Sequence, residues 1–327
     1  MRAAFVVRVL ALLALGAAGL LPGASAAAEY PDRPIHWVVP YAAGGTTDVV
    51  ARNVAQTISQ LLGWTIVIDN HAGAGGRLAM AAVAKANPDG YTLLVSDASL
   101  ATAPSLYTQL SFDTAKDLLP IAMFATVPHI VVMNPEVKAN SLGELIALGK
   151  KDPGKLNFGS GGIGSPLHLA GEALRLETGI PWTHVPYRGA GPAVVAAISN
   201  EVQVATPSLP AALAQVQAGT LRALAVMSPK RLPTLPDVPT VAELGFPKAT
   251  VQGWVGLHAP AGTPPEVMNA LEKAVAKALQ SPELRARLAQ LGADVSAETG
   301  AAYGKLVAEE TVRWKQVVEA AGIPPQQ

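Results

Sequence analysis

The segment IHWVVPYAAGGTTDVVARNVAQTISQLLG (residues 35–63) decides the fold class of this chain, because a strand, a glycine-rich loop and a helix follow one another in it. Residues 35–39 form a short, mostly apolar run, which predicts a buried strand. Residues 48–62 repeat small and apolar side chains at helical spacing, and Gly63 is a typical helix stop. A helix that begins directly after the loop of residues 40–48 presents free backbone N–H groups there, and such a helix start is a general binding site for an anion.

A second glycine-rich loop, residues 159–165, lies between the predicted strand 156–158 and a predicted helix that begins at Ser165 and ends at Gly179. Its glycines also satisfy the G-x-G-x-x-G pattern of dinucleotide-binding loops. That function requires an acidic residue near the end of the following strand to bind the ribose, and residues 183–185 with the proline after them provide none. We therefore expect either a second anion-binding loop or a tight turn without a ligand.

Strand-like and helix-like patterns alternate along the chain, which predicts an α/β fold with largely parallel sheets covered by helices. Further strands are predicted at 65–68, 91–95, 130–133 and 221–226, and further helices at 76–86, from 141, from 192, from a capping box at 263–266, from 281 and at 298–320. The pattern starts again near residue 128, and the prolines of residues 229–239 predict an extended crossing. We therefore expect two similar lobes, at 27–127 and 128–230, with residues 231–327 crossing back and adding C-terminal helices to the first lobe.

The first 26 residues have the pattern of a secretory signal peptide. Arg2 and Arg8 give a basic start, residues 9–21 form an apolar run too short to span a bilayer comfortably, and small residues at 24–26 provide a cleavage site. The cleavage site argues against the alternative of a retained membrane anchor. Beyond this leader the sequence has no second apolar stretch of 18 residues. We therefore expect a periplasmic mature chain that is exported, cleaved after Ala26 and not itself embedded in a membrane.

The composition disfavours several classes of function. The chain has 24 basic and 24 acidic side chains, without the excess of positive charge that nucleic-acid binding requires. It has no cysteine, which rules out disulfides, thiolate chemistry and sulfur-ligated metals. Its six histidines lack metal-ligand spacing, Ser160 and Ser165 do not stand in G-x-S-x-G, and no P-loop motif occurs. We therefore expect a binding protein without catalytic residues, metal or cofactor.

Hydroxyl side chains and glycines recur where the predicted strands end, and ligands of open α/β sheets bind at that edge. The hydroxyl residues are Thr46, Thr47, Ser160 and Ser165, and further glycines stand at 73–76 and 189–191. The same hydroxyl residues are also typical helix caps, and both roles are compatible. The sequence therefore favours binding by neutral donors over binding by charged side chains.

Three charged residues belong to these loops. Arg188 is the only cation in them, and it either pairs with a distal carboxylate of the ligand or is a solvated surface residue. Asp48 is expected to organise its loop at the helix start rather than to act as a catalytic acid. Asp97 follows the predicted strand 91–95. Its carboxylate is suited to accept a hydrogen bond from an amine or hydroxyl group of the ligand, whereas it would repel a second carboxylate of the ligand.

Six strings in a fixed order resemble one known family. They are YPDRPIHWVVPYAAGGTTDVVAR (30–52), NHAGAGG (70–76), NPDGYTLL (87–94), KLNFGSGGIGSPLHLAGE (155–172), HVPYRGAGPA (184–193) and LPDVPTVAELG (235–245). Over essentially its whole mature length, the chain closely resembles the extracytoplasmic solute-binding proteins of tripartite tricarboxylate transporters, the Bug-type receptors. The resemblance implies a two-lobed, type II periplasmic-binding-protein architecture with a ligand cleft between the lobes. It also implies that the lobes close on a ligand, which is then delivered to the permease subunits of a membrane transporter.

The resemblance further implies that one carboxylate is held by the first glycine-rich loop and by the glycine-serine loop, partly through water, with specificity contacts on three other loops. The ligand-binding residues expected in total are Tyr41, Ala43, Gly44, Gly45, Thr46, Thr47, Asp48, Gly75, Ser96, Asp97, Ala98, Ser160, Gly161, Ser165, His168, Tyr187, Arg188 and Ser208. The chain departs from the common pattern of the family at Ala43, at Arg188 and at residues 205–208, which leaves the identity of the ligand open.

These observations predict a monomeric periplasmic receptor that captures a small organic carboxylate by lobe closure and performs no chemical step. Two alternatives stay open. One is an exported enzyme that acts on a small carboxylate in the same cleft, and the other is a ligand-sensing receptor for a signalling partner. Mono-, di- and tricarboxylates, amino acids and aromatic acids are all compatible with the sequence.

Overall fold

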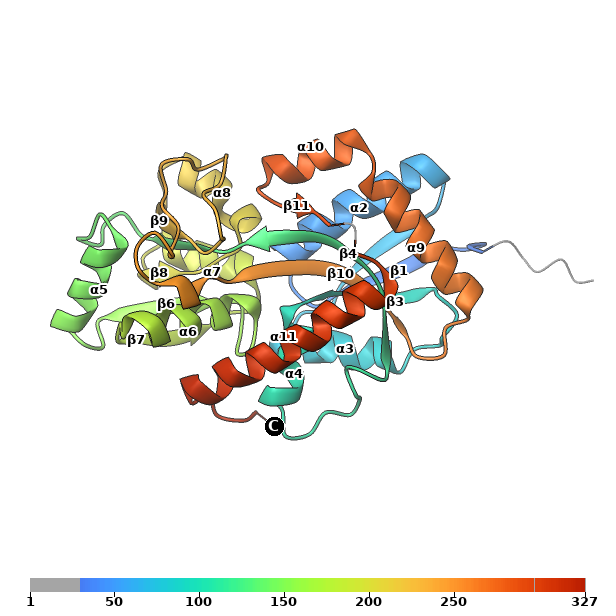
Figure 1. Cartoon of the computed structure of the whole chain (residues 1–327), viewed down its shortest axis with the longest axis horizontal. Helices are drawn as coiled ribbons and strands as arrows, with labels where there is room; N and C mark the ends of the chain where they lie inside the picture. The colour runs from blue at the N-terminus through green and yellow to red at the C-terminus, as the bar shows by residue number, and fades with distance from the viewer. Residues whose placement is uncertain (1–29, 297, 327) are drawn as a thin grey trace, which may run out of the picture. The chain divides into compact units, whose positions relative to one another are not determined.

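Mixed β-sheets organise the protein, and helices flank them (Figure 1). The computed structural model describes residues 30–296 and 298–326, and within this part the strands form two sheets. The predicted signal peptide, with Arg2, Arg8 and the cleavage site at 24–26, lies outside the described residues. From Arg33 onward the described chain belongs to one compact unit that contains both sheets. The α/β class predicted from the alternating patterns is confirmed.

The first sheet has the strand order β11-β4-β10-β3-β1-β2. Its strands are β1 Ile35–Val39, β2 Ile66–Asn70, β3 Thr92–Asp97, β4 Leu118–Pro128, β10 Gln252–Pro260 and β11 Asp294–Val295, and its helices are α2 Thr46–Leu62, α3 Arg77–Ala84, α4 Ala98–Leu106, α9 Pro265–Leu279, α10 Pro282–Gln290 and α11 Gly300–Ala321. β1 pairs in parallel with β2 and β3, whereas β10 runs antiparallel to β3 and β4. Because β1 and β3 are parallel, the starts of α2 and α4 lie at the same edge of this sheet.

The second sheet has the strand order β7-β6-β8-β5-β9. Its strands are β5 Ile130–Met133, β6 Leu156–Ser160, β7 Trp182–Pro186, β8 Val204–Ala205 and β9 Arg222–Val226, and its helices are α5 Leu142–Lys151, α6 Pro166–Thr178, α7 Ala190–Ile198 and α8 Leu209–Gln217. β6 pairs in parallel with β7 and β8, and β5 is antiparallel to β8 and β9. The strand-loop-helix unit of the first sheet is therefore repeated in the second, as the two glycine-rich loops predict.

Two long strands join the halves of the protein. β4 ends at Pro128, and after His129 the chain continues as β5 of the other sheet. β10 pairs with β4 along its whole length, from Gln252 against Pro128 to Pro260 against Leu118. Figure 1 shows β4 and β10 side by side between the helices of the first sheet and those of the second. Any motion of one half against the other therefore has to pass through these strands and their ends.

A shared apolar core connects the two sheets. One buried cluster includes Leu94 and Leu100 of the first sheet region together with Phe158 and Leu169 of the second. The long helix α11 lies against α4 and also reaches α6, where Arg175 Nη2 donates to the backbone oxygen of Ala321 at 3.1 Å (Figure 1). Burial of this apolar surface is the main stabilising contribution to the fold.

Local sequence signals predict most ends of the helices and strands, but three of the predictions made from the sequence are wrong. The capping box predicted at 263–266 does not form, because Pro264 is the N-cap of α9 and the Thr263 hydroxyl donates to the Pro260 carbonyl at 2.8 Å. Residues 229–239 do not cross between the sheets: Leu235 packs in a core cluster with Ile130 of the second sheet, and the returning strand is β10. α7 begins at Ala190 rather than at residue 192.

Sequence patterns do not predict β4, α4, α8 or β10. α4 has the sequence ASLATAPSL, with a proline inside it and almost every residue buried, so it lacks the one-sided apolar stripe of a surface helix. β4 and β10 are buried along most of their length and therefore do not alternate between apolar and polar residues. Among the described residues, the structure contains no helix long and apolar enough to cross a membrane.

Candidate functional site

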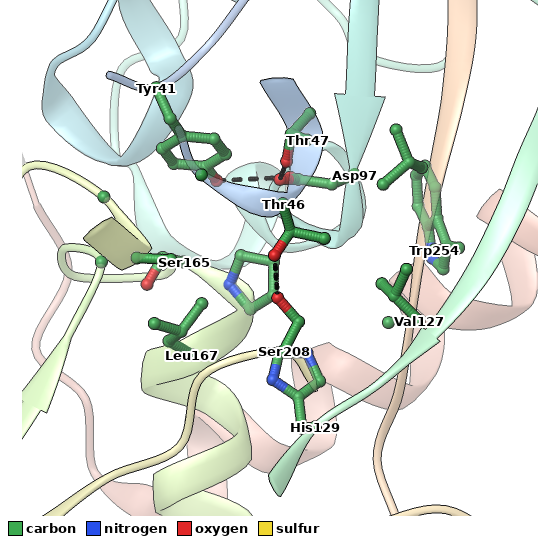
Figure 2. A pocket seen from close by; sticks show the side chains of 17 residues that line it. Tyr41, Thr46, Thr47, Asp97, Val127, His129, Ser165, Leu167, Ser208 and Trp254 are labelled. Atoms are coloured by element: carbon green, nitrogen blue, oxygen red, sulfur yellow. Dashed lines mark hydrogen bonds between the residues drawn. The ribbon is translucent and has the colours of Figure 1, made fainter. Parts of the chain in front are cut away.

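Helix starts from both halves of the protein converge on one cavity (Figure 2). The cavity has a volume of about 30 Å³ and opens toward solvent at its mouth. The N-cap residues of five helices line it, and they are Gly45 of α2, Asp97 of α4, Ser165 of α6, Gly189 of α7 and Ser208 of α8. A helix start carries a partial positive charge and N–H groups without a partner in the helix. The cavity therefore has the electrostatic character of an anion site without any basic side chain.

Three of these helix starts are not capped by their own side chains. The N-cap residues Gly45, Gly189 and Ser208 make no side-chain capping hydrogen bond. Gly45 and Gly189 have no side chain to offer, and the hydroxyl of Ser208 instead forms a hydrogen bond with the hydroxyl of Thr46. The first N–H groups of α2 and α7 are therefore donors that a ligand or water in the cavity can reach. α8 adds only the N–H of Leu209, because Pro210 has none and the Ala211 amide donates to the Ser208 carbonyl.

The two halves touch each other across the cavity. The hydrogen bond between Thr46 and Ser208 joins the start of α2 to the start of α8 (Figure 2). A second one runs from Thr102 Oγ1 of α4 to the backbone oxygen of Gly164 at 3.0 Å. Both pairs join residues of the first sheet region to residues of the second. The described arrangement is therefore a closed one, in which opposing loops meet directly.

Asp97 presents a buried carboxylate to the cavity. Its Oδ1 accepts from the Ser99 amide at 2.9 Å, the Ser99 hydroxyl at 2.6 Å and Tyr41 Oη at 3.3 Å. Its Oδ2 accepts from Thr47 Oγ1 at 3.1 Å. Burial raises the pKa of this carboxyl, although these hydrogen bonds act in the opposite direction. All of the donors are neutral, so the carboxylate is solvated by hydrogen bonds without a balancing cation.

Asp48 lies outside the cavity and organises the first glycine-rich loop. Its carboxylate accepts from the Gly44 amide at 2.9 Å, from Arg52 Nε at 3.0 Å and from Asn70 Nδ2 at 3.0 Å. Burial by itself would raise the pKa of Asp48, but the hydrogen bonds from Arg52, Gly44 and Asn70 outweigh it and hold the pKa below its usual value. The ionised side chain therefore fixes the loop that leads into α2.

Two stacked histidines support the second glycine-rich loop from outside the cavity. The rings of His168 and His184 lie 3.9 Å apart at 18°. His168 Nδ1 accepts from the Gly164 amide at 3.1 Å, and Ser160 Oγ lies 2.5 Å from His184 Nε2. Burial lowers the pKa of His168 to about 3 and that of His184 to about 4, so both rings are neutral at pH 7. Neither histidine lines the cavity, and Ser160 is fully buried beneath it.

The structure divides the predicted binding residues into three groups. Those that line the cavity are Tyr41, Gly45, Thr46, Thr47, Asp97, Gly161, Ser165 and Ser208. Those that line a neighbouring space of about 260 Å³, which shares Tyr41 and Gly161 with the first, are Gly75, Tyr187 and Arg188. Those that line neither are Ala43, Gly44, Asp48, Ser96, Ala98, Ser160 and His168.

Physical reasons account for the residues outside both spaces. Ala43 and Gly44 are exposed at the tip of the loop. Ser96 is hydrogen-bonded to His258 Nδ1 at 2.8 Å and to Tyr303 Oη at 3.0 Å, on the face of the sheet that α11 covers. Because side chains of a strand alternate between faces, Ser96 and Asp97 cannot both point into the cavity. Ala98 is buried in the first turn of α4.

Several cavity residues are missed by sequence reasoning. They are Val127 and His129 at the end of β4, Pro166 and Leu167 of α6, Gly189 and Ala190 at the start of α7, and Gly253, Trp254 and Val255 of β10. Most are apolar or small and stand in elements whose sequence gives no functional pattern. His129 does not stand at metal-ligand spacing from another histidine, and the sequence alone therefore indicated a structural role for it. Within the described residues, no group of three or more His, Cys, Asp or Glu side chains is placed to hold a metal ion.

A cleft between two helix-flanked mixed sheets, walled by helix starts, defines a periplasmic solute-binding protein, and solved structures of periplasmic binding proteins share this fold. Residues 50–323 match the family described as tripartite tricarboxylate transporter family receptor, and the chain belongs to that family. The predicted family and the predicted two-lobed architecture are thereby confirmed.

Relatives match the chain over nearly its full length. It is 40% identical to Protein BugT of Bordetella pertussis over 295 residues, which is 90% of each chain. The solved structure of R. palustris Rpa4515 with adipate is 34% identical, with a TM-score of 0.88 over 91% of this chain and 100% of that one. The structure of MatC from Rhodopseudomonas palustris with bound malate is also 34% identical, with a TM-score of 0.84 over 88% and 100%.

Proposed function

We propose that this protein is a periplasmic receptor that captures a small organic carboxylate between its two halves and delivers it to the permease subunits of a tripartite transporter. The observation that carries the proposal is the convergence of five helix starts on one cavity, three of them without a side-chain cap. Such a set of N–H donors is complementary to a carboxylate group. The receptor family to which the chain belongs supports the transport role.

The ligand class is supported by two relatives. The structures of Rpa4515 and MatC hold adipate and malate, which are both small organic carboxylates. At about 34% identity over nearly the whole chain, the same architecture is expected to place its helix starts around a carboxylate in this protein. Contacts beyond that carboxylate depend on the residues of this chain.

Closure is proposed to take place about β4 and β10. The lobes would correspond to residues 27–127 and 128–230, except that the segment after residue 230 stays with the second sheet until β10 returns the chain to the first lobe. The membership of the strands in the two sheets supports this division, since β4 ends at Pro128 and β10 carries the chain back. The hydrogen bonds between Thr46 and Ser208 and between Thr102 and Gly164 would form on closure and break on opening.

A binding role is favoured over an enzymatic one by the position of the Ser–His contact. Ser160 and His184 are within hydrogen-bond distance, as a nucleophile and its base would be, but Ser160 is fully buried and neither residue lines the cavity.

Export is proposed to remove residues 1–26, and the mature chain is proposed to act as a monomer. Mass spectrometry of the protein recovered from a periplasmic fraction tests the cleavage, which is expected after Ala26.

The decisive experiment is calorimetric titration of the purified mature protein with a panel of organic acids, followed by NMR of the recovered ligand. Saturable binding of at least one acid, with about 2.7 kcal/mol of stabilisation at a ligand concentration 100 times Kd, is expected. Recovery of the unchanged ligand supports the receptor, whereas conversion of the ligand supports the exported enzyme. Failure of every acid to bind would contradict the proposal. Co-purification from membranes with a sensor protein instead of a permease would favour the signalling alternative.

A further inference from the structure

His129 places an unpaired acceptor in the wall of the cavity. Its Nδ1 lies 3.0 Å from the backbone oxygen of Thr206, and because a carbonyl only accepts, Nδ1 carries the proton and donates. The other ring nitrogen, Nε2, then has a free lone pair. It is buried and has no hydrogen-bond partner within the part of the chain that the structure describes. The residue is 1% exposed and lines the cavity near Ser208 (Figure 2).

The surroundings hold the imidazole in this neutral form. Burial lowers the pKa of His129 to about 4, against a smaller opposite effect of the hydrogen bond to Thr206. A Cβ atom at Gly253 would lie 2.9 Å from Nε2, so the glycine of β10 leaves the room that the ring occupies. A buried acceptor without a donor is unfavourable, so a donor group that reaches Nε2 when the halves close on a ligand would be stabilised there.

The same cavity lacks the cation that a second carboxylate of the ligand would need. Among the described residues that line it, Asp97 is an acidic side chain and none is a lysine or arginine. Arg52 is bound to Asp48, which is outside the cavity. Arg188 is exposed and lines the neighbouring space. A carboxylate at the helix starts is therefore favoured, while a second one would face the lone pair of His129 without a cation to balance it.

We propose, on the basis of the function proposed above, that the physiological ligand carries a single carboxylate and, at its other end, a hydroxyl or ammonium group that donates a hydrogen bond to His129 Nε2. The carboxylate binds at the uncapped starts of α2, α7 and α8. His129 is thus a specificity-determining residue at the junction of the two halves, where β4 gives way to β5.

Two matched series of compounds test this inference by calorimetry. The four-carbon series is succinate, 4-hydroxybutyrate, 4-aminobutyrate and butyrate, and the six-carbon series is adipate, 6-hydroxyhexanoate, 6-aminohexanoate and hexanoate. In the series that fits, the hydroxy or the amino acid is expected to bind at least tenfold more tightly than both the dicarboxylate and the unsubstituted acid. The hydroxy and amino members distinguish the two kinds of donor.

Two variants locate the effect at His129. His129→Asn retains an amide N–H that can donate to the Thr206 carbonyl but has nothing at the position of Nε2, and it should reduce the preference for the donor-bearing acid to about twofold or less. His129→Gln places an amide group near the position of Nε2 and should retain part of the preference. Thermal unfolding of both variants verifies that they fold.

The outcomes separate this inference from the function on which it rests. Tighter binding of succinate or adipate than of the hydroxy and amino acids overturns the inference and leaves the carboxylate receptor intact. An unchanged preference in a folded His129→Asn variant overturns the role of His129. Failure of all eight acids, while another acid of the wider panel binds, overturns the inference and leaves the receptor intact. Failure of the whole panel contradicts the proposed function, and the inference with it.

Discussion

At the scale of single residues, two aspartates that follow strands of the same sheet have opposite surroundings. Asp48 is held ionised by Arg52, Asn70 and a backbone amide, and it fixes a loop. Asp97 receives hydrogen bonds only from neutral groups, and it lines the cavity. The environment, rather than the type of residue, therefore decides which carboxylate organises the site and which one faces the ligand.

The stacked histidines predict a pH dependence of stability. The pKa of His168 is about 3 in the folded protein and roughly 6.5 in the unfolded chain, so the unfolded state binds more protons as the pH falls below about 6.5. The contribution of His168 to stability is present at neutral pH and is lost toward acid pH, by about 2 kcal/mol between pH 7 and pH 5. His168→Asn keeps an acceptor for the Gly164 amide but does not titrate.

Urea unfolding at pH 7 and pH 5 measures this effect. The difference in the free energy of unfolding between the two pH values should be smaller by about 2 kcal/mol in His168→Asn than in the unchanged protein. The lost ring stacking lowers stability at both pH values and therefore cancels in this difference. An equal pH dependence in the two proteins would show that His168 is not held neutral by the fold.

Arg188 is expected to affect the rate of binding rather than the contacts of the bound ligand. It is exposed in the space beside the cavity, across from Arg77 of the other half. Positive charge beside an entrance accelerates the association of an anion, so Arg188→Gln should slow association by about threefold at low ionic strength and by less at high salt.

Stopped-flow fluorescence separates the two rate constants. The dissociation rate should stay within about twofold of its original value, because the effect is long-range. Lys273→Gln makes the same change of charge at an exposed position of α9 and should leave both rate constants unchanged. A large rise of the dissociation rate in Arg188→Gln would instead show that its guanidinium contacts the bound ligand.

At the scale of secondary-structure elements, the starts of helices perform two tasks in this protein. Ser141 and Ser165 both cap a helix, with the Ser141 hydroxyl accepting from the Glu144 amide at 3.2 Å and the Ser165 hydroxyl from the His168 amide at 3.3 Å. α5 and α6 thus begin in the same way, but of the two serines only Ser165 lines the cavity. This pair allows the capping contribution to be separated from the ligand contribution.

Replacement of each serine by alanine tests the separation. Ser141→Ala and Ser165→Ala should each lower the free energy of unfolding by about 1 kcal/mol, since each removes one capping hydrogen bond. Only Ser165→Ala should also weaken binding of the carboxylate, by about fivefold or more, because a neutral donor to the anion is lost. Chemical denaturation and calorimetry measure the two quantities. Equal ligand affinities in the two variants would show that Ser165 is a cap and nothing more.

At the scale of the whole molecule, backbone approaches across the cleft limit how far the halves can close. Gly75 of the short 3₁₀ helix η2, Ala74–Gly76, belongs to the first half and has φ +60°, and a Cβ there would lie 2.5 Å from the carbonyl oxygen of Ile163 in the second. Only a residue without a side chain permits this contact. Glycine at this position is therefore a requirement of the closed arrangement.

Gly75→Ala should consequently favour the open protein. We expect a Kd at least about tenfold higher, because closure has to work against the new contact, and a fall in the thermal midpoint no larger than that of the control, because alanine is strained at a positive φ in both. Calorimetry measures the affinity, and small-angle scattering with saturating ligand measures the closure. Gly154→Ala is the matched control, because Gly154 also has a positive φ, +86°, and a Cβ there meets nothing within 4 Å. An unchanged affinity and an unchanged scattering profile would contradict the role of Gly75.

The sequence by itself determined the local elements and the family. Strand β1 and helix α6 have the positions that their patterns predict, since apolar spacing, caps and stop glycines act over a few residues. The two glycine-rich loops also indicated an anion site, and eight of the expected binding residues lie in the cavity. Buried elements such as α4 and β10 were not predictable, because a segment that is covered on all sides carries no periodic pattern.

Only the tertiary structure decided which side chains meet. Thr46 and Ser208 are 162 residues apart in the sequence, yet they form one hydrogen bond across the cleft. The packing of β10 against β4 brings Gly253 to His129 and leaves one ring nitrogen unpaired in the cavity, while Arg188 turns out to line a different space. These relations depend on contacts between distant segments, and local sequence signals contain no information about them.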